Sequence, residues 1–391
     1  MKFWSKTNNK VILLALTMCN ALLMVAIRDP EFVLRSLNAG ANTRSEFRSS
    51  IFCNSFPECF RQGSALIGEL PIRFINAMGS VSDVSSVNYG RSETEIFEFV
   101  SLSVSYLYRG AALLLMGYFL WKIFDSLAAA FVFLNAIIFH MAGTTQVVSM
   151  KLVNPFLELQ LVPSVMATIN HTVQVHSRMY LKFYDYAALV VIFCVIYLVS
   201  KGYVAFYSPK RLTLIGFLSA SVFEHIGVVV AIACAYIAIQ TSERAYFKIG
   251  AAIASGTGLY IVVVLLLSRL MLGKGETNLF STYRSYAIGN IRHFDQVLAG
   301  ALIVVIPSLV LGFLCSTCKL LHVQTYPEKY DQVILGIEGI LLGLVCTYFV
   351  GFFTSGMSSE IGRQTLAFQV LLIIYTAIMG EKFFERRKTM L

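Results

Sequence analysis

Long apolar runs recur along this chain, and they limit what it can fold into more than any other feature does. A helix needs about 20 consecutive apolar residues to cross the hydrocarbon core of a bilayer. Hydrophobic residues make up 57% of the 391 residues and charged residues only 14%, whereas a soluble domain carries about 25% charged residues. A chain with so little charge cannot cover its own surface in water. The sequence therefore predicts an all-α, polytopic integral membrane protein with about 9–10 transmembrane helices.

One segment leaves the number of spans open. Residues 149–183 are partly apolar but contain Pro155 and Pro163, so they form either an interfacial or re-entrant segment or a tenth span. Nine spans and a cytoplasmic N-terminus put the basic C-terminal tail outside, against the positive-inside tendency, whereas ten spans return it to the cytoplasm. The expected spans are 11–27, 97–121, 126–148, 184–202, 212–240, 246–272, 296–316, 332–354 and 364–380.

Three regions follow from this pattern. Residues 1–27 form an N-terminal cytoplasmic segment and a first membrane anchor, because lysines precede an apolar run that has no clear cleavage site after it. Residues 28–95 form a long polar extracytoplasmic loop, in which 65–78 is a candidate interfacial helix. Residues 96–391 form the multi-span membrane domain.

Two cysteine pairs are candidate disulfides. Cys53 and Cys59 share the first loop, and Cys315 and Cys318 stand at the end of an expected span. A disulfide in each pair would place both regions on an oxidising face. Zinc is the competing ligand, but no His lies at the usual ligand spacing, so we predict no metal site. Phosphate-loop, zinc-helix and nucleophile-elbow motifs are absent from the sequence, and we predict no cofactor.

Ionisable residues inside the apolar runs are the candidate functional residues, because burying them in lipid is costly. Glu98 and Arg109 share one expected span but lie about 16 Å apart along a helix, so each needs another partner. His140, His225 and Glu338 stand in later spans. Structural roles compete with functional ones: Glu98 can snorkel to the interface, Arg109 can form an ion pair, and His140 can be a hydrogen-bonded core residue.

Four short windows, taken in order, resemble the EpsG/Wzy-type polysaccharide polymerases. These multi-span enzymes join lipid-linked oligosaccharide repeats on the outer face of the bacterial inner membrane. An Arg-Gln-x-Leu-Ala segment expected before the His-containing helix is missing, and Tyr184-Asp185-Tyr186 stands there, with Arg178 upstream. The windows are residues 95–102 with Glu98, 218–227 with His225, 283–286 with Arg284, and 359–366 with Arg363.

The resemblance implies glycosyl transfer from an undecaprenyl diphosphate-linked oligosaccharide in the inner (plasma) membrane. Glu98 or His225 would be the catalytic base. Arginine suits the diphosphate because its planar fork donates two parallel hydrogen bonds. The expected partners are the lipid-linked glycan, membrane lipids and other polysaccharide assembly proteins, and not nucleic acid, because the basic residues are scattered. The candidate anion contacts are Arg109, Arg178, Arg284 and Arg363.

Two other functions remain open from the sequence. A transporter or flippase for a lipid-linked or small anionic substrate would use the same charged residues as a binding site without making bonds. A non-catalytic subunit of a membrane complex would use its apolar helix faces to bind a partner.

Overall fold

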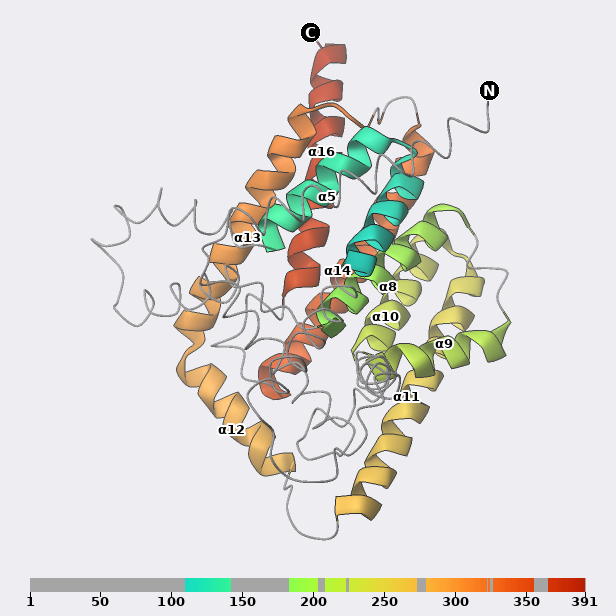
Figure 1. Cartoon of the computed structure of the whole chain (residues 1–391), viewed down its shortest axis with the longest axis vertical. Coiled ribbons are helices and arrows are strands. Elements are labelled where there is room, and N and C mark those ends of the chain that lie inside the picture. The colour runs from blue at the N-terminus through green and yellow to red at the C-terminus, as the bar shows by residue number, and fades with distance from the viewer. Residues whose placement is uncertain are drawn as a thin grey trace, which may run out of the picture.

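The computed structural model describes residues 110–141, 183–202, 208–222, 225–272, 279–321, 323, 326–354 and 365–390, and these are helical without any strand (Figure 1). Three helical segments in this part of the chain are long and apolar enough to cross a membrane: Arg244–Val264, Pro327–Phe353 and Leu366–Phe384. The predicted fold class is thus confirmed at the level of an all-α membrane protein. The first anchor and the polar loop, residues 1–95, lie outside the described residues.

Most helices begin and end near the limits that hydropathy predicts. α16 ends ten residues beyond the expected position 380, because the helix continues through a charged segment after the apolar run. The amphipathic helix α12 was not predicted, and it meets α13 at an angle (Figure 1). In chain order the helices are Gly110–Phe124, α5 (Leu127–Met141), α8 (Phe183–Ser200), α9 (Pro209–Val222), α10 (Ile226–Thr241), α11 (Arg244–Leu272), α12 (Leu279–Arg292), α13 (Phe294–Thr317), α14 (Pro327–Thr354) and α16 (Leu366–Met390).

The prediction of one continuous span over 212–240 is wrong. This apolar stretch forms two helices, α9 and α10, which both pack against α11. α9 and α11 pack closely because glycines, which have no side chain, stand where the two backbones meet. A Cβ atom added at Gly216 would lie 2.9 Å from the Ile253 carbonyl carbon, and one added at Gly256 would lie 2.8 Å from the Thr213 carbonyl carbon. Hydropathy alone does not register such backbone contacts.

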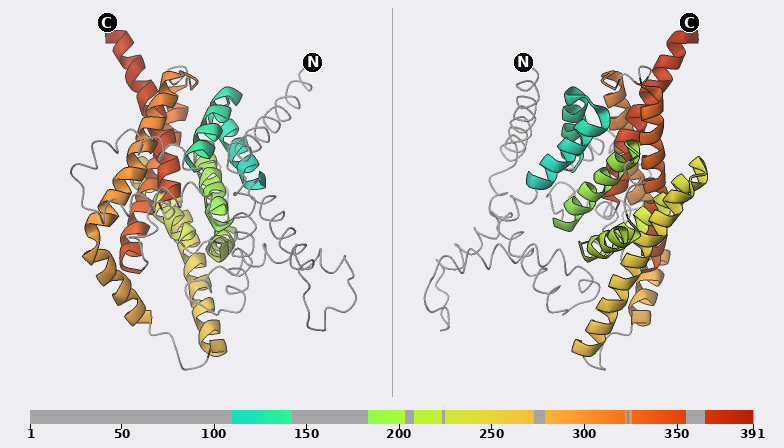
Figure 2. Two further views of the ribbon diagram at one scale, coloured as in Figure 1. Left: turned by 60° about the vertical axis from the view of Figure 1, so that its left-hand side comes forward. Right: turned by 90° about the vertical axis from the view of Figure 1, so that its right-hand side faces the viewer.

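The two helices contact α11 in different orientations. On α9, the Phe217 ring lies 5.1 Å from that of Tyr260, and the earlier Thr213 lies against Gly256. The later Gly216, however, lies against the earlier Ile253, so α9 crosses α11 rather than running along it. On α10, Gly227 lies against Thr257 while the later Ala231 lies against Gly250, so α10 is antiparallel to α11. Figure 2 shows α9 beside the middle part of α11.

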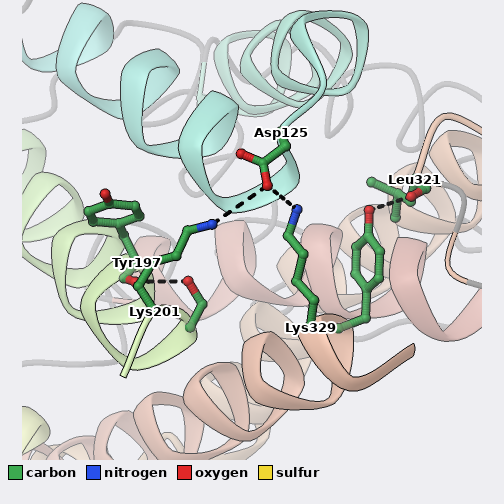
Figure 3. Close-up of polar contacts among 7 residues, drawn as sticks. Asp125, Tyr197, Lys201, Leu321 and Lys329 are labelled. Atoms are coloured by element: carbon green, nitrogen blue, oxygen red, sulfur yellow. Dashed lines mark hydrogen bonds and ion pairs between the residues drawn. The ribbon is translucent and has the colours of Figure 1, made fainter. Parts of the chain in front are cut away.

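One end of the bundle is defined by an ion-pair cluster (Figure 3). Asp125, in the turn before α5, contacts Lys329 at 2.7 Å and Lys201 at 3.5 Å. The helix Gly110–Phe124 and α8 therefore end where α14 begins. Lys382 of α16 pairs with Asp331 at 2.6 Å at this same end, and α16 continues past the other helices there (Figures 1 and 2). We call it the tail end, and the opposite end of the bundle the far end.

α10 returns the chain to the tail end. It is antiparallel to α14, since Ala233 lies against Gly339 and the earlier Val229 lies against Gly343. These glycines form a Gly-x-x-x-Gly pattern, which allows two helix backbones to approach closely in a membrane. The chain thus lies at the tail end after α8, crosses α11 in α9, and comes back to the tail end along α10.

Candidate functional site

Two of the candidate catalytic and substrate-binding residues, His225 and Arg284, lie in the part of the chain that the structure describes. His225 is exposed and immediately precedes α10, with its backbone at φ −86° and ψ −20° and no side-chain cap hydrogen bond to the helix. Arg284 is exposed on α12. Both stand toward the far end, on different helices, because α10 begins there and α12 packs on the last part of α14.

The positions at which their helices contact α14 show how far apart the two residues lie. Val229, one turn after His225, lies against Gly343. On α12, Asn290 donates a hydrogen bond from Nδ2 to the backbone oxygen of Phe352 at 2.7 Å. Nine residues of α14, or about 13 Å of helix, separate these contacts. His225 and Arg284 therefore share an end of the bundle but do not form a contiguous pair.

The other candidates lie outside the described residues. In the sequence, Arg109 directly precedes Gly110, Arg178 comes five residues before α8, and Arg363 comes three residues before α16. The three helices that follow them all run from the far end toward the tail end. Glu98, Cys53 and Cys59 also lie outside the described residues.

Cys315 and Cys318 are free thiols at the tail end of α13, so the structure contains no disulfide between them. The Cys318 side chain is exposed, and its Sγ donates to the backbone oxygen of Leu314 at 3.9 Å. Cys315 is half-buried. Because both cysteines lie at the tail end, they are at the end of the bundle opposite His225.

Glu338 is held by two phenols in the middle of the bundle. The hydroxyl of Tyr236 on α10 donates to its Oε2 at 2.9 Å, and that of Tyr375 on α16 donates to its Oε1 at 3.1 Å. Glu338 lies about 16 Å along α14 from Pro327, and all three side chains are half-buried. The carboxylate thus links three helices at the depth where a free charge would be costly.

His140 belongs to a second polar network, which is sealed in the core. Its Nε2 lies 2.7 Å from Gln369 Oε1 and 3.3 Å from Ser308 Oγ. All three side chains have no exposed surface, and Gln369 Nε2 donates to Thr365 at 2.8 Å. The network joins α5, α13 and α16, so the structural role considered for His140 is the one that the geometry supports.

Sequence reasoning missed two carboxylates at the tail end. Partial burial opposes ionisation of Asp125, but the ammonium groups of Lys329 and Lys201 lower its pKa below the usual 3.8. Glu381 is 2% exposed and accepts the backbone N–H of Leu321 at 3.2 Å. Asp125 separates two apolar runs in the sequence, a signal that marked a turn. Nothing in the local sequence indicates the Glu381 contact, because its partner lies 60 residues away.

Compared with the known protein families, with curated proteins and with solved structures, this chain matches none of them.

Proposed function

We propose that this chain is a multi-pass membrane enzyme that transfers glycosyl units from a lipid-linked diphosphate donor, with its active site toward the far end. One observation carries the proposal. The two described candidate residues, His225 and Arg284, are both exposed, and both lie toward the far end of the bundle. The four sequence windows that resemble polysaccharide polymerases supply the reaction type.

The distribution of lysines supports an outward-facing site. The tail end carries Lys122, Lys201, Lys319, Lys329 and Lys382. Positive charge concentrates on the cytoplasmic side of membrane proteins, so the tail end faces the cytoplasm in this proposal. The far end then faces outward from the plasma membrane, which is where polymerases of the resembled type act.

In the proposed reaction an acceptor hydroxyl attacks the anomeric carbon of the donor sugar. His225, or Glu98, takes the hydroxyl proton as the new C–O bond forms. The bond to the diphosphate breaks, and undecaprenyl diphosphate leaves with its electron pair. Arg284, together with Arg109, Arg178 and Arg363, would contact the departing diphosphate.

The test uses the purified chain in liposomes with a lipid-linked oligosaccharide, and product length as the readout. His225→Gln should lower the rate by about 10²-fold or more if His225 is the base, and Arg284→Ala should lower it while Arg284→Lys retains part of it. Arg244→Ala is the matched control, because Arg244 is also exposed but lies where α11 begins. Wild-type protein that never extends the glycan, or His225 and Arg284 variants as active as the control, would contradict the proposal.

The Glu338 contact favours transport as the second candidate function. A carboxylate held between helices at mid-bilayer depth is typical of substrate and ion pathways, and it requires no bond-making chemistry. A transporter would move the lipid-linked or small anionic substrate across proteoliposomes and leave it chemically intact. Recovery of extended product would contradict this second candidate.

A further inference from the structure

The cluster of Glu338, Tyr236 and Tyr375 belongs to neither set of site residues above, and we call it the carboxylate clasp. Both oxygens of the Glu338 carboxylate accept a hydrogen bond from a phenol, at 2.9 Å and 3.1 Å. An ionised carboxylate only accepts hydrogen bonds, so two phenol donors match the charged form. The donors stand on α10 and α16, and the acceptor stands on α14.

The groups around the clasp leave Glu338 without a basic partner among the described contacts. α10 presents Tyr236 and α16 presents Tyr375. α8 packs on α14 two residues before Glu338, where Val199 and Ile196 lie against Gly336. α12 hydrogen-bonds to α14 at Phe352, 14 residues further along. The nearest charged side chain on α14 is Asp331, and it already pairs with Lys382.

A carboxylate at this depth that has hydrogen-bond donors but no cationic partner in the described part of the chain can become neutral by taking up a proton. The described residues contain no group of three His, Cys, Asp or Glu side chains that could hold a metal ion. The hydrogen bonds described for the clasp include no carbonyl oxygen, and hard cations require several oxygen ligands. The chemistry therefore favours a proton over a metal cation.

We propose that the carboxylate clasp is an intramembrane proton-binding site, and that binding a proton at Glu338 changes how α14 is tied to α10 and α16. One proton from water converts the carboxylate to a carboxylic acid, with no other bond made or broken. The acid has one O–H donor, so one phenol must turn from donor to acceptor or lose its hydrogen bond. This inference goes beyond the proposed glycosyl transfer and holds whether or not that function does.

A hydrophobic carbodiimide tests the proposal, because it adds to protonated carboxyl groups in apolar surroundings to give a stable N-acylurea. The probe is dicyclohexylcarbodiimide, which is applied to the full chain in liposomes at a series of pH values between about pH 5 and about pH 9. Mass spectrometry of the peptide that carries residue 338 measures the fraction labelled. Labelling of Glu338 should fall as the pH rises, because only the protonated carboxyl group reacts with the carbodiimide. Glu338→Gln should abolish the label.

The phenols supply a second, independent readout. The double variant Tyr236→Phe/Tyr375→Phe keeps the rings but removes both donors to the carboxylate, so Glu338 should be labelled more strongly than in wild type at every pH where wild type is partly labelled. Glu381→Gln is the matched control, because it removes another buried carboxylate and should leave the label at Glu338 unchanged. The proposal is overturned if wild-type Glu338 takes no label at any pH, or if its labelling is independent of both pH and the two phenols.

Discussion

Lys329 Nζ lies 2.7 Å from Asp125 Oδ2, and this contact joins residues that are 204 positions apart in the chain. Lys201 approaches the same oxygen at 3.5 Å. The Lys329 side chain is 18% exposed and that of Asp125 is 60% exposed. The ion pair therefore stands at the surface of the tail end, where it fixes the turn between the helix Gly110–Phe124 and α5 to the start of α14.

Removing Lys329 should destabilise the protein more than removing Lys201. Exposed ion pairs contribute about 0.2–1 kcal/mol, and the shorter contact should give the upper part of that range. The measurement is thermal unfolding of Lys329→Ala and Lys201→Ala in detergent micelles. Lys382→Ala, which removes the separate pair with Asp331, is the control for general loss of charge. Equal midpoints for the first two variants would contradict the ranking.

Stability should decrease in acid partly because of Asp125. Its pKa is lowered in the folded state by Lys329 and Lys201, so the unfolded chain takes up the proton at a higher pH than the folded chain does. The stabilisation is therefore complete above the usual value of 3.8 and is lost as the pH falls through the lower, folded pKa. Asp125→Asn should remove this part of the acid sensitivity, which unfolding midpoints across a pH series would show. An unchanged acid profile would show that other carboxyls dominate it.

Alanine should be tolerated at one α14 glycine and not at another. A Cβ atom at Gly343 would lie 2.5 Å from the Val229 carbonyl oxygen, whereas one at Gly336 would lie 3.6 Å from Val199. Gly343→Ala should therefore cost about 1–3 kcal/mol through overpacking, while Gly336→Ala should be neutral or slightly stabilising because alanine favours the helix. Chemical unfolding in micelles measures both. Similar behaviour of the two variants would mean that α10 and α14 are not packed this closely.

Gln369→Leu should weaken the core more than Ser308→Ala does. The first change removes the 2.7 Å partner of His140 and the second removes the 3.3 Å partner. A buried polar atom that loses its hydrogen-bond partner costs about 1–3 kcal/mol. The unfolding free energy of each variant can be compared with that of the double variant Gln369→Leu/His140→Phe, which should recover stability because neither polar group remains. No recovery would indicate that the fit of the side chains matters more than the hydrogen bond.

Hydropathy was sufficient to locate the helices that are apolar on all sides. α8 begins one residue before its expected start at 184, and α11 ends at the expected residue 272. It failed where amphipathic or charged residues continue a helix, as in α12 and in the last ten residues of α16. These segments are helical without being uniformly apolar, so no hydropathy threshold detects them.

The candidate site was less predictable than the fold. The sequence singled out His225, Glu338 and His140 as costly residues, and the structure gives each a different setting: exposed before a helix, held by two phenols, and sealed in a core network. The partners of the last two lie 37 to 229 residues away in sequence. Spacing within one helix carries no information about such contacts, so the role of each residue could not be separated beforehand.

The return of the chain to the tail end along α10 changes the expected membrane topology. Hydropathy assigns 212–240 a single passage through the bilayer, yet Lys201 after α8 and the last residues of α10 lie at the same end of the bundle. The chain is therefore back at the tail end at Thr241, whereas the nine-span expectation places it at the opposite end there. Reporter fusions placed after α10, α13 and α16 should give the same compartment as one placed after α8, because all four positions lie at the tail end of the bundle.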